Sequence, residues 1–175
     1  PEIGIVCLET IQGGAGIIEA PAEFWQGLRA LCDEKGVLWV ADEVQSGTGR
    51  SGRFFAFEHY GVVPDVTALA KSLGGGKTAM AAMIARTPIY MKAYGKPATA
   101  LIHGPATFGG IGEACITSIE ALNIMYDDDL MQNATTVGAY MKSELQRLQE
   151  KHPKLIKDVR GRGFMKIISL APEVL

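Results

Sequence analysis

Two oppositely charged side chains follow runs of apolar residues in this sequence. Asp42 comes directly after the run at residues 37–41, and Lys71 comes directly after the run at residues 66–70. Short apolar runs of this kind are typical of strands that are buried on both faces of a parallel sheet. Because open α/β sheets bind ligands at the carboxyl ends of their strands, we expect both side chains at one site.

An amine and a carboxylate at one site are the two protein groups that pyridoxal phosphate needs. The amine forms an imine with the cofactor's aldehyde, and the carboxylate keeps the pyridine nitrogen protonated. Once a substrate amine displaces Lys71, the freed amine can move the substrate's α-proton. Considered separately, each residue has a simpler explanation, because an aspartate after a strand usually caps a turn and a lysine is usually solvated.

The apolar pattern around these residues predicts an α/β layered fold, a three-layer sandwich with a mainly parallel sheet. Strands are expected at residues 3–8, 37–41, 66–70 and 81–85. The segment at residues 44–64 is rich in glycine, serine and arginine, and it predicts a long functional loop with one helical turn.

Three helices are expected to accompany the sheet. The first starts with Pro21 in its first turn and ends before Gly36. Helical spacing assigns its apolar face to Phe24, Leu28, Leu31 and Cys32.

The other two helices are expected at residues 113–126 and 130–151. Three aspartates at residues 127–129 are expected to cap the last helix. Spacing assigns the apolar face of that helix to Val137, Tyr140, Met141, Leu145 and Leu148.

Composition narrows the possible functions. The formal net charge of −2 over 175 residues gives no basic surface for nucleic acid. Cys7, Cys32 and Cys115 lie in apolar surroundings and predict reduced, buried thiols in a cytoplasmic protein. The sequence has no signal peptide and no apolar run long enough to span a membrane, and its histidines lack the spacing of metal ligands.

Five motifs, in order along the chain, resemble the signatures of class-III aminotransferases. Residues 42–52 (DEVQSGTGRSG) resemble DEVQxGxGRxG, and residues 64–76 (PDVTALAKSLGGG) resemble PDxxxxAKxLGGG, whose lysine holds the cofactor as a Schiff base. Residues 9–13, 103–110 and 159–163 resemble EPxQG, HxxTFGG and VRGxG. The resemblance implies a fold-type I transferase that uses pyridoxal phosphate to move an amino group from an amino acid or ω-amine donor to a 2-oxo acid.

The resemblance also implies roles for single residues. Asp42 would pair with the pyridine nitrogen, Val44 would pack on one face of the ring, and Gln45 would bond near the ring hydroxyl. Thr107 would bind the cofactor phosphate of a neighbouring subunit, which implies a homodimer with shared sites. Glu9 would support the site as a carboxylate, or would cap the glycine loop that follows it.

The resemblance divides the chain into three parts. Residues 1–125 belong to the large cofactor-binding domain, residues 126–158 form connecting helices, and residues 159–175 start a small C-terminal domain. Both ends look cut, and the family's phosphate cup and substrate-binding arginine would lie outside the chain. We therefore expect weak cofactor binding and little or no transaminase activity from these 175 residues alone.

Departures from the family pattern leave the amino donor open. Gly14 stands where many members have the glutamate of QGEGG, and Ile111 and Gly112 replace an Asn-Pro pair. Diamines, ω-amino acids and acetylornithine-like donors all remain possible.

Two other functions compete with this interpretation. Residues 74–78 (GGGKT) resemble the end of a phosphate-binding loop, but the first glycine of that loop would fall on Lys71. A non-catalytic binding or assembly module is the second alternative.

Overall fold

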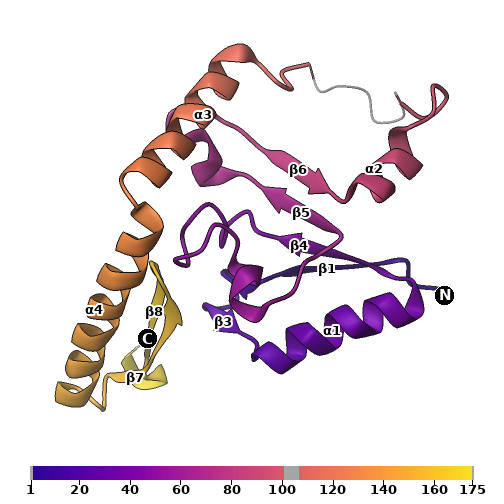
Figure 1. The fold of residues 1–175 in the computed structure, drawn as a ribbon. Coiled ribbons are helices and arrows are strands. Elements are labelled where there is room, and N and C mark those ends of the chain that lie inside the picture. The colour runs from indigo at the N-terminus through magenta and orange to yellow at the C-terminus, as the bar shows by residue number, and fades with distance from the viewer. Residues whose placement is uncertain (1, 101–106, 175) are drawn as a thin grey trace.

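In the computed structural model, which describes residues 2–100 and 107–174, a four-stranded sheet lies at the centre of the chain (Figure 1). Its strands, in order across the sheet, are β1 (Ile5–Glu9), β4 (Leu38–Asp42), β5 (Val66–Leu69) and β6 (Ala82–Ala85). β1, β4 and β5 are parallel, and β6 pairs antiparallel with β5. The predicted α/β class with a mainly parallel sheet is therefore confirmed.

α1 (Ala22–Lys35) covers one face of the sheet and packs against β4 and η1 (Ala56–Tyr60) in the larger of the two core clusters among the described residues. Pro21 is its N-cap, and Gly36 ends it with a φ of 64°, a left-handed conformation that glycine adopts without strain. The start and end of this helix thus fall within one residue of those expected from Pro21 and Gly36.

The packed face of α1 agrees with the expected one at Leu28 and Cys32 but differs at two other positions. Trp25 and Cys32 are buried against Trp39 of β4, and the two indole rings stack with centroids 5.5 Å apart. Phe24 and Leu31, which the helical spacing assigned to this face, are 47% and 51% exposed. Trp25 thus takes the buried position that the spacing assigned to its neighbour Phe24.

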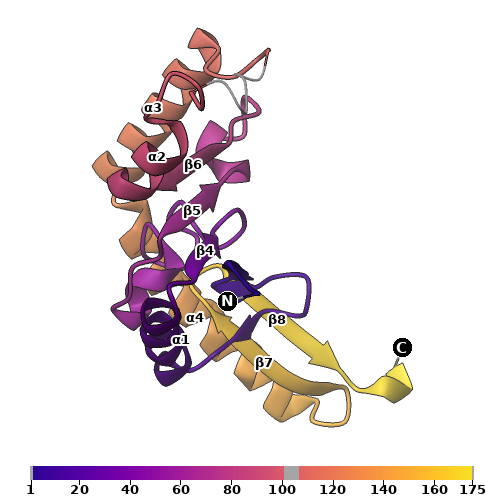
Figure 2. The same ribbon diagram turned by 90° about the vertical axis from the view of Figure 1, so that its right-hand side faces the viewer.

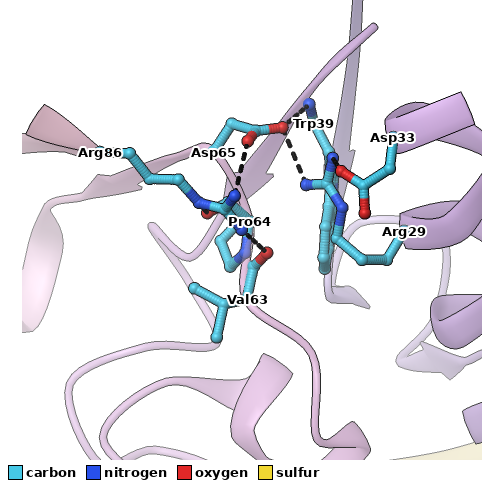
Figure 3. A network of polar contacts seen from close by, with 7 residues as sticks. All are labelled: Arg29, Asp33, Trp39, Val63, Pro64, Asp65 and Arg86. Carbon is cyan, nitrogen blue, oxygen red and sulfur yellow. Dashed lines mark hydrogen bonds and ion pairs between the residues drawn. The ribbon is translucent and has the colours of Figure 1, made fainter. Parts of the chain in front are cut away.

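Asp65 joins α1 to the two central strands at the amino end of β5 (Figure 3). Its Oδ2 accepts the Trp39 backbone N–H at 2.8 Å and an Arg29 Nη1–H at 2.8 Å. Arg86 Nη1 lies 3.4 Å from the other carboxylate oxygen. This network sets the register of β4 and β5 at the sheet edge opposite to the one that carries Asp42.

The second half of the chain is helical and ends in a hairpin (Figure 2). α2 (Thr87–Tyr94) was not anticipated, whereas α3 (Gly112–Asp127) and α4 (Leu130–Lys151) lie within one residue of their expected positions. β7 (Ile156–Arg162) and β8 (Met165–Leu170) pair antiparallel, and β7 lies along α4.

The small elements of the fold are the strands β2 (Ile11–Gln12) and β3 (Ile18–Glu19) and three single-turn 3₁₀ segments. These segments are η1 (Ala56–Tyr60), η2 (Lys71–Gly74) and η3 (Pro172–Val174). η1 is the helical turn expected within residues 44–64.

The packed face of α4 also differs from the expected one. Ala134 and Gly138 are its buried residues, while Val137, Tyr140 and Leu148 are 42%, 67% and 43% exposed. A Cβ atom on Gly138 would lie 2.3 Å from the Gly163 carbonyl oxygen. The hairpin therefore approaches α4 where the helix has its smallest side chains.

Two further expectations are wrong. Asp129 is the N-cap of α4 but has a φ of 48° and makes no side-chain cap hydrogen bond, because an N-cap side chain reaches the helix amides from an extended backbone. Cys7 is an exposed free cysteine, since no described element covers its face of β1, whereas Cys32 is buried as expected.

Among the residues that the structure describes, no helix has the length and apolar character that a membrane span requires. The same residues contain no group of three or more histidine, cysteine, aspartate or glutamate side chains able to hold a metal ion.

Candidate active site

The carboxyl ends of the three parallel strands bring several expected site residues to one edge of the sheet. Glu9 at the end of β1 is the register partner of Asp42 at the end of β4, and Asp42 is the register partner of Ala68 in β5. Lys71 follows Ala68 by three positions in the chain. The strand ends thus place Glu9, Asp42 and Lys71 along the same edge.

Lys71 stands at a sharp change of backbone direction. It begins η2 directly after β5, its side chain is exposed, and its φ of 51° lies in the left-handed region. That conformation costs a non-glycine residue about 1–2 kcal/mol, and such strain is concentrated at functional sites. The neighbouring glycine Gly75 packs closely on α3, where a Cβ atom would lie 2.8 Å from Ala121 Cβ.

A cavity of about 400 Å³ lies beside Lys71, between the sheet edge and the β7–β8 hairpin. Its volume is within the range of about 300–1,000 Å³ that is usual for small-molecule sites. Three of the expected site residues line it, namely Val44, Gln45 and Lys71. The rest of its wall consists of Ile17, Arg50, Ser72, Phe164, Met165 and Lys166.

Asp42, Glu9 and Thr107 are not among the residues that line this cavity. The Asp42 carboxylate is half-buried and accepts the Val44 backbone N–H at 3.0 Å. Thr107 is exposed in a turn before α3, and His103 lies outside the described residues. The structure therefore brings together the Lys71 amine, the Val44 side chain and the Gln45 amide. The Asp42 carboxylate lies two positions before Val44 in the chain.

Glu9 caps the glycine loop, the second of the two roles considered for it. Its Oε2 accepts the Gly13 backbone N–H at 3.0 Å. Gly13 in turn lies against the side chain of Gln45, so that a Cβ atom at position 13 would lie 2.1 Å from Gln45 Oε1. Glycine at this position lets Gln45 rest across the loop and reach the cavity.

Glu43 is a buried carboxylate whose importance the sequence analysis missed. It is 1% exposed, and it accepts hydrogen bonds from two hydroxyl and two backbone N–H groups. Burial raises its pKa, and the hydrogen bonds from Thr10, Ala56, Ser46 and Phe57 act in the opposite direction. A signal was present in the sequence, because Glu43 continues the alternation that buries every second residue of β4.

Arg50 and the hairpin residues were not expected in the cavity wall. Arg50 is exposed, and its side chain forms no ion pair within the described part of the chain. Burial lowers the pKa of Lys166, whose Nζ donates to the Gly161 carbonyl at 3.0 Å. No local sequence signal links these residues to Lys71, because the docking of the hairpin brings them there.

Comparison with known proteins places these features in a family context. The family described as "Aminotransferase class-III" matches residues 1–174. An acetylornithine aminotransferase of Caldanaerobacter subterraneus subsp. tengcongensis is 43% identical over 164 residues, which are 94% of this chain and 39% of that protein.

Solved structures agree with this similarity. An ornithine aminotransferase from Plasmodium yoelii superposes with a TM-score of 0.87 at 36% identity, covering 97% of this chain and 43% of that one. An amine transaminase from an uncultivated Pseudomonas species, solved in its PLP-bound form, has a TM-score of 0.88 at 34% identity, covering 95% and 37%. The chain thus spans well under half the length of these relatives.

Proposed function

Because the chain belongs to the class-III aminotransferase family, we propose that it forms part of an enzyme that uses pyridoxal phosphate. This enzyme would move an amino group from an amino acid, ω-amine or diamine donor to a 2-oxo acid. The cavity beside Lys71 is the observation that carries the proposal, since it joins an exposed amine to an aliphatic wall and an amide. The non-catalytic alternative has no comparable observation in its favour.

The residues around the cavity fit this cofactor. The lysine amine would bond covalently to the cofactor's aldehyde carbon, Val44 would pack on the ring, and Gln45 would donate a hydrogen bond near the ring hydroxyl. Asp42, at the same edge, would hold the proton on the ring nitrogen. The bound cofactor supplies an electron sink for the bond that breaks at the substrate's α-carbon.

Lys71 has a second role in this proposal. When it is not bonded to the cofactor, the Lys71 Nζ would act as a general base and acid, accepting a proton from the substrate and returning it. The left-handed backbone at Lys71 would help to direct the amine toward the cavity. Glu9 supports the same edge indirectly, because it orders the loop on which Gln45 rests.

We further propose a cytoplasmic homodimer in which Thr107 serves the neighbouring copy. Thr107 is exposed and is not part of the wall of its own chain's cavity, which fits a role toward the cofactor phosphate of a partner. Residues 1–125 would then be part of the large domain, residues 126–158 the connecting helices, and residues 159–175 the start of the small domain.

The donor is proposed only as a class. The related proteins named above are described as acting on acetylornithine, ornithine or amines, and Gly14 leaves no carboxylate at that position of the glycine loop. A diamine, an ω-amino acid or an acetylornithine-like compound would each present a primary amine to Lys71.

The test is covalent labelling of Lys71. The purified chain, mixed with excess pyridoxal phosphate, is expected to turn yellow and, after borohydride reduction, to carry the pyridoxyl group on Lys71, located by mass spectrometry. Lys71→Ala is expected to abolish the colour and the label, whereas Lys77→Ala, which changes an exposed lysine nearby, should keep both. Equal labelling of both variants would contradict the proposal.

A further inference from the structure

The Glu43 carboxylate joins three separate segments of the chain. Its Oε1 accepts the Thr10 hydroxyl at 2.6 Å and the Phe57 backbone N–H at 3.2 Å. Its Oε2 accepts the Ser46 hydroxyl at 2.9 Å and the Ala56 backbone N–H at 2.9 Å. The link between β1 and β2, the turn after β4, and the start of η1 therefore meet on one side chain.

No cationic side chain in the described part of the chain pairs with this carboxylate. None of the ion pairs in the described part of the chain includes Glu43, so hydroxyl and amide dipoles alone compensate for its burial. Each carboxylate oxygen holds one backbone N–H, and a backbone N–H can only donate. A side chain that accepts fewer hydrogen bonds would leave buried donors unpaired, which is costly.

The backbone of Glu43 also closes the turn that follows it. The Gly47 N–H donates to the Glu43 carbonyl at 2.9 Å, and a Cβ atom on Gly47 would lie 2.7 Å from that oxygen. Val44 and Gln45 lie within this turn, and both line the cavity beside Lys71. The position of both residues therefore depends on how firmly Glu43 is held.

We propose that Glu43 is a positioning residue, whose buried carboxylate fixes the turn at residues 43–47 and thereby holds Val44 and Gln45 beside Lys71. The expected effect on cofactor binding rests on the proposed function, because a loosened turn would bind the cofactor more weakly. The effect of Glu43 on the turn itself does not depend on the cofactor. Glu43 itself touches neither the cavity nor the proposed ring.

The first measurement is amide hydrogen exchange in the cofactor-free chain. Glu43→Gln keeps the size of the side chain but replaces one acceptor oxygen by a donor, so the Gly47 amide is expected to exchange about tenfold faster or more. The Asp65 amide, which donates to the Trp39 carbonyl at 2.9 Å, should keep its rate. Glu23→Gln changes an exposed carboxylate of α1 and should alter neither amide.

The second measurement is capture of pyridoxal phosphate. The cofactor concentration that gives half-maximal borohydride labelling of Lys71 is expected to rise about tenfold in Glu43→Gln, equivalent to the loss of one hydrogen bond to a charged group. The label at saturation should stay on Lys71, and the pH midpoint of the yellow absorbance should shift. If Glu43 contributed to stability alone, neither the half-maximal cofactor concentration nor the pH midpoint would change in a chain that circular dichroism shows to be folded.

A milder pair of variants decides the matter if Glu43→Gln does not fold. Thr10→Val removes one hydroxyl donor and should produce a smaller change in the same direction, while Thr10→Ser, which keeps the donor, should restore normal values. Unchanged Gly47 exchange and unchanged labelling in a folded Thr10→Val chain would overturn the inference. Failure of the proposed function would give a different result. The chain without substitutions would then not be labelled at Lys71, while Glu43→Gln would still speed the exchange of the Gly47 amide.

Discussion

Single residues at this sheet edge have their roles set by backbone conformation and burial as much as by residue type. Lys71 is exposed and lies in a left-handed conformation, whereas Glu43 is buried and fully bonded. Asp42 lies between these extremes, half-buried with its carboxylate on the Val44 amide. Among the titratable groups outside the site, His59 gives the clearest test of how burial sets charge.

The neutral state of His59 is predicted to contribute to stability. Burial lowers its pKa from 6.5, the charges of Arg162 and Arg53 act in the same direction, and hydrogen bonding to Ser51 opposes them. The unfolded chain therefore binds this proton more readily than the folded chain. The contribution is complete above about pH 6.5 and is lost as the pH falls through the lower folded value.

Urea unfolding at pH 7.5 and pH 5.5 measures this effect. The free energy of unfolding should fall between the two pH values, and it should fall less in His59→Gln, whose amide can still bond to Ser51 but cannot become charged. An equal fall in both proteins would show that other groups cause the pH dependence.

The secondary-structure elements depend on a few close contacts that residue type alone does not reveal. α4 meets the hairpin through Gly138, and α1 meets the sheet through Trp25 and through the Arg29–Asp65 pair. The sequence predicted the length of each helix, and these contacts set its orientation. Two substitutions test these contacts, each with a matched control.

Glycine-to-alanine changes in two helices are predicted to have opposite effects. At Gly27 in α1 an added methyl group would meet no neighbouring atom within 4 Å, so Gly27→Ala should stabilise the fold by about 0.5–1 kcal/mol through helix propensity. In Gly138→Ala the methyl group would lie 2.3 Å from the Gly163 carbonyl oxygen, so the fold should lose about 1–3 kcal/mol. Thermal unfolding measures both, and stabilisation by Gly138→Ala would contradict the close helix–hairpin contact.

Loss of the Asp65 charge is predicted to weaken the link between α1, β4 and β5. Asp65→Asn removes a buried charge that bonds to Arg29 and to the Trp39 amide, and should cost about 2–3 kcal/mol of unfolding free energy. Asp33→Asn removes the exposed partner of the same arginine and should cost about 0.5 kcal/mol or less. Urea unfolding of both variants makes the comparison, and equal losses would argue against a special role for the buried partner.

The molecule as a whole combines a sheet that α1 covers on one face, the long helices α3 and α4, and the β7–β8 hairpin (Figures 1 and 2). The hairpin forms one side of the Lys71 cavity. One face of the sheet packs on α1. On the other face, Ile5 and Met83 are each 57% exposed. The cavity therefore has one firm wall at the strand ends and one wall that depends on the docking of the hairpin.

Labelling without turnover is predicted for the 175-residue chain by itself. The chain spans 39% of the acetylornithine aminotransferase that it resembles, and neither Asp42 nor Thr107 lines the cavity beside Lys71. With excess pyridoxal phosphate, Lys71 should still be trapped by borohydride, while amino transfer from a diamine or acetylornithine to 2-oxoglutarate should be close to background. Steady turnover in that assay would contradict the prediction.

Local patterns in the sequence were sufficient for the parts of the fold that depend on neighbouring residues. The apolar runs before Asp42 and Lys71 predicted two central strands, and the residue pattern predicted α1, α3 and α4, with Pro21 and Gly36 marking the ends of α1. The motifs around Asp42 and Lys71 led to the family. These features could be predicted because the side chains of a strand or a helix alternate with a fixed period among neighbouring residues.

Only the tertiary structure decided which faces pack and what surrounds Lys71. Spacing chose Phe24 and Tyr140 for buried faces, yet Trp25 and Gly138 are buried, because the partner surface selects among neighbouring positions. Three of the four donors on Glu43, and the hairpin residues in the cavity wall, come from other segments of the chain. Long-range contacts of this kind leave no periodic signal, since they depend on how complete elements fit together.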